Sequence, residues 1–279
     1  ASDAVHMLIA AFVSTGFAAA GVHALRLLAR SPKRELHQLG MRLALGMGAV
    51  AALLQPISGD LSAKDVAQRQ PAKLAAMEAL YTTQRGAPLL IGGIPDDEAR
   101  EVRWGLEIPN GLSFLAFADP HAEVKGLDSI PRDEWPPTLV CHVAFQIMVG
   151  VGSLLALLGV GFLFLRFRRP QLLDDRRVLF ITALTTPLGF IAVEAGWTVT
   201  EVGRQPWIIY GVMRTAEAVS PMPGLMWPML AITAVYGLLG SLTWFVVARL
   251  IRAAEYGSLD PHARTPKIDS DKLAEPAHG

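Results

Sequence analysis

Five apolar stretches constrain this chain more than any other feature of its sequence. A helix needs roughly 20 apolar residues to cross the hydrocarbon core of a bilayer, and each stretch is that long. They run approximately over residues 4–28, 36–57, 138–165, 178–200 and 222–251. Because lipid satisfies no backbone hydrogen bonds, such segments can cross it only as helices or as strands of closed barrels, and their length favours helices. We therefore predict an all-α fold, a polytopic membrane helical bundle of about five transmembrane helices.

Composition agrees with this prediction and excludes several classes of site. The chain is 52% hydrophobic and 18% charged, and its formal net charge is zero, so no overall positive field points to a nucleic-acid partner. Cys141 is the single cysteine, which excludes an internal disulfide, a multi-cysteine zinc site and a covalently attached heme of the C-x-x-C-H kind. A bound metal or cofactor must therefore be held by His, Met or carboxylate side chains.

The distribution of basic residues predicts the orientation in the membrane. Lys and Arg gather after the first, third and fifth apolar stretches: Arg26, Arg30, Lys33, Arg34; Arg166, Arg168, Arg169, Arg176, Arg177; Arg249, Arg252. Since cytoplasmic loops concentrate basic residues, we expect these segments and the C-terminus inside, and the N-terminus outside. The first stretch has no basic flank and is too long for a signal peptide, so we expect it to remain in the mature chain.

The predicted spans divide the chain into four segments. These are residues 1–57 (helices one and two), 58–137 (a long extracytoplasmic loop), 138–254 (helices three to five) and 255–279 (a disordered cytoplasmic tail). Loops longer than about 15 residues are usually functional or disordered, and we favour function for this one. Within it we predict an amphipathic helix over residues 65–83, followed by a Gly- and Pro-broken stretch and an acidic patch at residues 96–98.

Some ligating side chains inside the spans suggest heme binding. Counted inward at about 1.5 Å per residue, Met148 lies about 25 Å, Glu194 about 24 Å and His6 about 32 Å above the cytoplasmic edge. A His and a Met at similar depth on different helices form the ligand pair of a low-spin heme. Each alone has an ordinary alternative, since an isolated Met usually packs in a core and a His near a helix end can lie among headgroups. His142 is about 240° around the helix from Met148, so we assign it to packing or to the outer interface.

Glu194 is the strongest single candidate for a functional residue. It lies in the apolar run Ile191-Ala-Val-Glu-Ala-Gly-Trp197, in the middle of the predicted fourth helix. A carboxylate in such surroundings needs neutralisation by a proton, a cation or iron.

Four motifs resemble subunit I of the cytochrome bd family of quinol oxidases. The most specific is Glu194-Ala-Gly-Trp197 followed by Glu201-Val-Gly-Arg-Gln-Pro-Trp207. The others are Gly59-Asp60 with Gln70-Pro-Ala-Lys-Leu-Ala-Ala-Met-Glu78, which resembles the quinol-binding loop motif, Phe145-Gln-Ile-Met-Val-Gly150 and Val5-His6-Met7. They occur in the order that the family has.

The resemblance implies roles for particular residues. It implies that His6 and Met148 ligate a low-spin heme b, that Glu194 is the axial ligand of a second, high-spin heme b, and that Lys73 and Glu78 take part in quinol oxidation. In such a reaction a carboxylate could accept a quinol proton, while an ammonium could bind the quinol oxygen or keep the carboxylate ionised. A solvated salt bridge on a loop helix is the structural alternative for that pair.

Three further residues belong to the implied cofactor sites. Arg204 could pair with a heme propionate or anchor the outer loop at the headgroups, and Trp197 and Gln146 lie next to the implied ligands. The family usually has Arg at position 146 and, in its better-known members, Trp at position 190, where this chain has Gln146 and Phe190. Gln146 removes a fixed positive charge and should lower the heme potential.

The resemblance also implies partners, because the family's subunit I has four additional N-terminal helices that carry the His ligand of its oxygen-reactive heme. The chain then corresponds to the C-terminal half of subunit I in the bacterial cytoplasmic (inner) membrane. It would need a membrane chain that supplies those helices, a subunit II-like companion, and a heme d or other third heme shared with a partner. The expected activity is that of a quinol:oxygen oxidoreductase.

Two other functions remain open at this point. A bd-related membrane cytochrome b could serve electron transfer or assembly without reducing oxygen. A secondary transporter could use Glu194 for proton coupling, although the chain shows no internal repeat of the kind that such folds usually carry.

Overall fold

The computed structural model describes residues 2–255, which fall into two compact units divided between Val219 and Ser220. Each unit is described by itself. The predicted tail of residues 255–279 lies outside the described residues except for Glu255.

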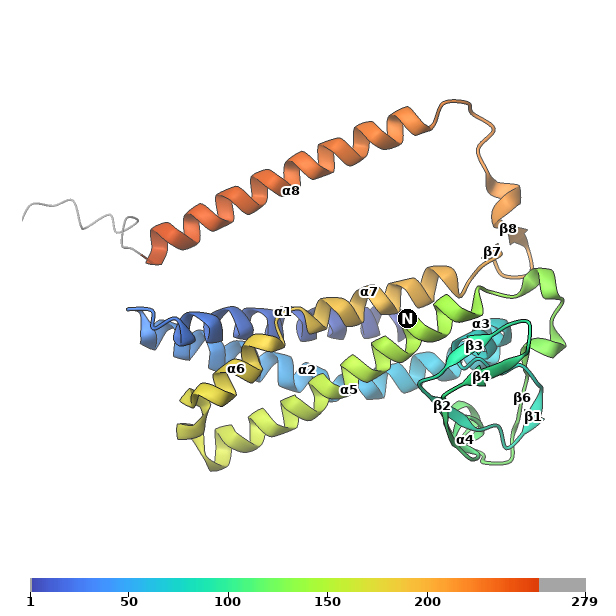
Figure 1. The fold of residues 1–279 in the computed structure, drawn as a ribbon, viewed down its shortest axis with the longest axis horizontal. Coiled ribbons are helices and arrows are strands. Elements are labelled where there is room, and N and C mark those ends of the chain that lie inside the picture. The colour runs from blue at the N-terminus through green and yellow to red at the C-terminus, as the bar shows by residue number, and fades with distance from the viewer. Residues whose placement is uncertain (1, 256–279) are drawn as a thin grey trace, which may run out of the picture. The chain divides into compact units, whose positions relative to one another are not determined.

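The first unit is built mainly from long helices (Figure 1). Its α-helices are α1 (Ser2–Leu28), α2 (Arg34–Arg69), α3 (Pro71–Met77), α4 (Gly111–Phe117), α5 (Thr138–Arg168), α6 (Arg176–Leu184) and α7 (Leu188–Val202). Short 3-10 helices lie at Leu127–Ser129, Arg132–Glu134, Pro170–Asp174 and Thr215–Ala218. The second unit contains α8 (Met226–Glu255), whose sequence is apolar on every face. Such a helix is typical of a membrane span.

The prediction of five membrane-crossing segments is confirmed. The structure has five segments long and apolar enough to cross a bilayer, at Asp3–Leu28, Arg34–Arg69, Thr138–Arg168, Arg176–Val202 and Met226–Ala253. The fold is mostly helical, as expected for the all-α class.

Four helices of the first unit close into a ring. Helix α1 contacts α2 and α7, and α5 contacts the same two helices, so α1 and α5 occupy diagonal positions (Figure 1). Small residues allow the close crossings: a Cβ on Gly16 of α1 would lie 2.6 Å from Gly48 Cα of α2. Buried Phe17, Met41 and Leu155 fill the interior between these helices.

Two helix breaks differ from the predicted pattern. The predicted helix over residues 65–83 is wrong in its bounds, because α2 continues to Arg69, the chain breaks at Gln70, and α3 ends at Met77. Gln70 has an extended φ of −137°, which is the conformation favoured for a residue that precedes proline. The predicted fourth helix is likewise divided into α6 and α7, just before and after Pro187.

The long loop contains small antiparallel ladders that the sequence did not suggest. They pair β1 (Gln84–Arg85) with β6 (Glu123–Val124), β2 (Leu89–Ile91) with β5 (Leu106–Ile108), and β3 (Ile94–Asp96) with β4 (Glu101–Arg103). A fourth ladder follows α7 and pairs β7 (Trp207–Ile209) with β8 (Met213–Arg214). Figure 1 shows the first three gathered beside the N-terminal part of α5, so the loop is a folded element.

Candidate functional site

His6 lies near the start of α1 and faces α2. Its Nδ1 is 2.9 Å from Ser58 Oγ, and its Nε2 is 3.0 Å from Gln55 Nε2. The Ser58 hydroxyl has one hydrogen, which it donates to the backbone carbonyl of Gln55 at 3.0 Å. The Ser58 oxygen therefore accepts from His6 Nδ1–H. The unprotonated nitrogen is then Nε2, whose lone pair faces Gln55 Nε2–H and is the one that could ligate a metal.

Met148 lies on α5, diagonally across the ring from α1. Its side chain is half-buried, and its sulfur lies only 2.9 Å from the position that a Cβ on Gly196 of α7 would take. The absence of a side chain at Gly196 therefore makes room for the thioether. The thioether of Met148 and the imidazole of His6 belong to diagonal helices, and each contacts a different neighbouring helix.

Glu194 and Trp197 share the outer face of α7. The side chain of Glu194 is exposed in the first unit, and Trp197 has 57% of its surface exposed. Phe190, one turn before Glu194, is also exposed. Glu194 is thus an exposed carboxylate between large apolar side chains, which is unusual for a surface that meets only lipid.

Lys73 and Glu78 are both buried, in contrast to the solvated salt bridge that was the structural alternative. Lys73 lies in α3 and Glu78 directly follows this helix, and the two side chains are 9% and 6% exposed. Oε2 of Glu78 is buried and has no hydrogen-bond partner. A buried carboxyl group without a partner is a chemically activated group, because its charged form is poorly solvated.

Burial determines the protonation of Glu78. Desolvation raises the pKa of Glu78 from its ordinary value of 4.5 to about 8. No nearby positive charge counters this effect, so Lys73 does not keep the carboxylate ionised. Glu78 is mostly protonated at neutral pH and is a comparatively strong base once it ionises.

Lys73 points toward the end of α7. Its Cγ lies 3.2 Å from the position of a Cβ on Gly203, and the Sγ atom of Cys141 is 3.0 Å from the same position. Desolvation lowers the pKa of Lys73, and the positive charge of Arg204 lowers it further. Arg204 itself is exposed. The structure thus brings the loop helix, the start of α5 and the sequence after α7 to one point.

Gln146 is engaged with the long loop. Its Nε2 donates to the carbonyl of Leu90 at 3.0 Å, and its Oε1 accepts from the N–H of Gly92 at 3.0 Å. These two hydrogen bonds use both the NH₂ group and the carbonyl oxygen of the side-chain amide.

His142, one turn before Gln146, is a residue whose importance the sequence did not reveal. It is fully buried, as the packing interpretation requires, but both ring nitrogens contact backbone carbonyls: Nδ1 is 2.8 Å from Met77 O and Nε2 is 3.0 Å from Gly92 O. The spacing of four residues between His142 and Gln146 was the available signal, because it places two polar side chains on one face of an apolar helix.

A second polar connection joins the loop after α7 to the segment before α5. The guanidinium of Arg214 donates to Asp133 at 3.1 Å and to Glu134 at 2.8 Å, and it lies 5.2 Å from the centre of the Trp207 ring. This contact holds the β7–β8 hairpin against the end of the long loop.

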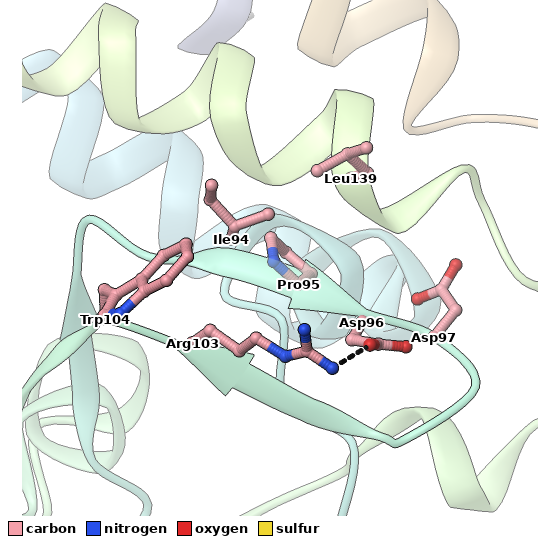
Figure 2. Close-up of a pocket in the computed structure, with 7 residues that line it drawn as sticks. All are labelled: Ile94, Pro95, Asp96, Asp97, Arg103, Trp104 and Leu139. Atoms are coloured by element: carbon pink, nitrogen blue, oxygen red, sulfur yellow. Dashed lines mark hydrogen bonds and ion pairs between the residues drawn. The ribbon is translucent and has the colours of Figure 1, made fainter.

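The long loop also contains a shallow cavity of about 300 Å³ (Figure 2). It is lined by Ile94, Pro95, Asp96, Asp97, Arg103, Trp104 and Leu139. Figure 2 shows Arg103 paired with Asp96 on the β3–β4 hairpin, close to Leu139 of α5. Neither Lys73 nor Glu78 lines this cavity, so the cavity and the buried pair are separate features.

In the part of the chain that the structure describes, no three His, Cys, Asp or Glu side chains form a metal-binding cluster.

Comparisons with known proteins agree on one family. The sequence model described as cytochrome bd terminal oxidase subunit I matches residues 1–255. A chain of Bacillus subtilis (strain 168) assigned as a cytochrome bd menaquinol oxidase subunit I is 38% identical over 257 residues, covering 88% of this chain and 56% of the relative. The cytochrome bd ubiquinol oxidase subunit 1 of the same organism is 32% identical, covering 98% and 60%.

A solved structure agrees as well. The bd oxidase from Geobacillus thermodenitrificans superposes with a TM-score of 0.80 at 33% identity, over 90% of this chain and 57% of that chain. The chain therefore spans a little more than half the length of the relatives that it matches.

Proposed function

Because this chain belongs to the cytochrome bd terminal oxidase subunit I family, we propose that it forms the quinol-oxidising, heme-binding part of a bd-type quinol oxidase. The observation that carries this proposal is the buried carboxyl group of Glu78, whose Oε2 has no hydrogen-bond partner, in the segment that resembles the family's quinol loop.

His6 and Met148 would hold a low-spin heme b. The donor set fits, since an imidazole and a thioether stand on diagonal helices of one ring and the hydrogen bond to Ser58 leaves His6 Nε2 with its lone pair. A heme held there supplies one-electron transfer. His6 must give up its contact with Gln55, whose buried Oε1 has no hydrogen-bond partner, to serve as a ligand.

Glu194 would be the axial ligand of a second, high-spin heme b, with Trp197 beside it. Its exposed position on α7 of the first unit leaves room for a heme on that face. Arg204 would pair with a propionate. Gln146 contributes no charge because its side-chain amide is neutral, and this amide hydrogen-bonds the loop backbone.

Glu78 would accept a proton from quinol, and Lys73 would hydrogen-bond the quinol oxygen. A carboxyl group with a pKa of about 8 binds the released proton more strongly than an exposed Glu does. With the long loop outside the cytoplasmic membrane, as the basic loops predict, the proton would leave on the outer side.

The partners would be a membrane chain that covers the α7 face, a subunit II-like companion and the surrounding lipid bilayer. A heme d or other third heme would lie at the shared boundary. A bd-related cytochrome b without oxygen reduction is the second candidate, and the exposure of Glu194 within the first unit favours it.

Difference spectra test the heme proposal. In the complex with native partners, His6→Ala and Met148→Leu should each remove the low-spin heme b signal, while His121→Ala and Met47→Leu, which change exposed residues, should keep it. A wild-type complex without any b-type signal, or an unchanged signal in both ligand variants, would refute the assignment. Quinol-driven oxygen uptake by the wild-type complex separates the oxidase from the second candidate.

Quinol oxidation tests the loop. Glu78→Ala should slow the reaction at least about a hundredfold at unchanged heme content, which is the lower end of the usual effect of losing a proton-transfer group. Lys73→Ala should also slow it at unchanged heme content. Lys125→Ala and Glu123→Ala change exposed residues of the same loop and are the matched controls. Parallel loss of heme and activity in the first two variants would indicate a structural role instead.

A further inference from the structure

Two side chains of α5 hydrogen-bond the backbone of the long loop. His142 contacts the carbonyls of Met77 and Gly92, and Gln146 contacts the carbonyl of Leu90 and the N–H of Gly92, at 2.8 to 3.0 Å. We call His142 and Gln146 the loop clamp.

The clamp joins two distant parts of the loop to one face of one helix. Residues four apart on a helix lie above one another, so His142 and Gln146 present a continuous polar edge on α5. Met77 is the last residue of α3, whereas Leu90 and Gly92 belong to β2 and the turn before β3. Gly92 has a φ of +69°, and its N–H donates to Gln146 Oε1. Its carbonyl oxygen lies 3.0 Å from His142 Nε2, which carries no hydrogen when the neutral ring donates from Nδ1 to Met77.

The contact with Met77 has a particular consequence for Glu78. The last carbonyls of a helix lack partners within the helix, and His142 provides one for Met77. The next residue is Glu78, whose own carboxyl group has an unpartnered oxygen. The position of that carboxyl group therefore depends on where His142 holds the end of α3.

We infer that His142 and Gln146 are positioning residues, which fix the loop on α5 and hold Glu78 in place for proton transfer. This inference rests on the proposed function of the loop. Neither residue needs to touch quinol. The bonds go to the main chain of the loop, so they constrain its path whatever side chains it carries. The same helix carries Met148 two residues further on, so the clamp also fixes the loop relative to a proposed heme ligand.

Hydrogen exchange tests the clamp without using enzymatic activity. In the purified complex, Gln146→Leu should speed exchange of the Gly92 amide about tenfold, because its acceptor is lost. Gln171→Leu changes an exposed glutamine beyond the C-terminal end of α5 and should leave that amide unchanged. Unchanged protection of Gly92 in Gln146→Leu would overturn the inference.

Steady-state kinetics test the positioning of Glu78. His142→Leu removes both contacts and should lower kcat for quinol oxidation about tenfold with a smaller change in KM, because a misplaced base slows proton transfer more than it weakens binding. His142→Gln retains a donor that can reach one carbonyl and should recover part of the loss. His121→Leu is the matched control in an exposed part of the loop.

The outcomes separate the inference from the function on which it rests. If Glu78→Ala is inactive with intact heme while His142→Leu has normal kcat, the loop function stands and the clamp inference fails. If Glu78→Ala is fully active, the proposed function fails, yet the exchange result for Gly92 still decides whether the clamp exists. Loss of heme in both His142→Leu and Gln146→Leu would make them structural residues and overturn the inference.

Discussion

Glu78 shows how a single carboxyl group acquires reactivity from its position. The charged form loses its hydration at this site, and no ion pair or hydrogen bond to Oε2 replaces what is lost. Its raised pKa follows from this burial. Of the two roles that the sequence left open for Lys73, keeping Glu78 ionised does not fit the structure, which directs Lys73 toward Gly203.

Quinol oxidation should therefore depend on pH through Glu78. The proton-accepting carboxylate increases as the pH rises through about 8, so the wild-type rate should rise between about pH 7 and 9. Glu78→Gln should be slow and should lose this rise, as measured by initial quinol oxidation rates across the pH range. A wild-type rate that is flat over this interval would contradict the assignment.

Glu78→Gln should slow quinol oxidation but should not lower the thermal stability of the complex at pH 8. Between pH 4.5 and about 8 the folded chain keeps the Glu78 proton that the unfolded chain releases, so folding becomes less favourable as the pH rises through this interval. Glu78→Gln cannot ionise and should match or exceed the wild-type Tm at pH 8. A lower Tm in a thermal melt of the complex would instead indicate that Gln disturbs the packing around the site.

His142 and Gln146 mark the limit of prediction at the scale of single residues. Their type and spacing could be read from the sequence, but their partners lie 50 or more residues away along the chain. The partners are backbone groups, which carry no sequence signature. A long-range contact of this kind follows only from the folded loop.

At the scale of elements, the spans were predictable because length and hydropathy decide them locally. The ladders of the long loop were not, since strands of two or three residues are stabilised by their surroundings more than by their own sequence. The breaks at Gln70 and before α7 follow from Pro71 and Pro187, whose local effect the broader apolar pattern concealed.

The crossing of α5 and α7 gives an element-scale prediction. A methyl group on Gly196 would meet the Met148 sulfur at 2.9 Å, so Gly196→Ala should displace the thioether and weaken or shift the low-spin heme signal. Gly150→Ala on α5 adds a methyl group where no other atom lies within 4 Å, and it should leave the spectrum unchanged. Identical spectra for the two variants would argue against Met148 as a ligand.

For the whole molecule, the basic segments predict a single orientation. Reporter fusions should place the end of α1, the segment between α5 and α6, and the end of α8 in the cytoplasm, and the loop around Trp104 outside. A cysteine introduced at position 104 offers a direct test, since Trp104 is 84% exposed and the native Cys141 is buried. It should react with a membrane-impermeant thiol reagent added to intact cells, and protection there would reverse the topology.

Position 203 should accept few substitutions, although Gly203 itself carries no reactive group. Three helices approach the position that a Cβ on Gly203 would take: α3 through Lys73, α5 through Cys141 and α7 through the carbonyl of Val199. Any larger residue would have to push at least one of them aside. Random mutagenesis should therefore find the region after α7 intolerant at Gly203, although the neighbouring exposed Arg204 has room for other side chains.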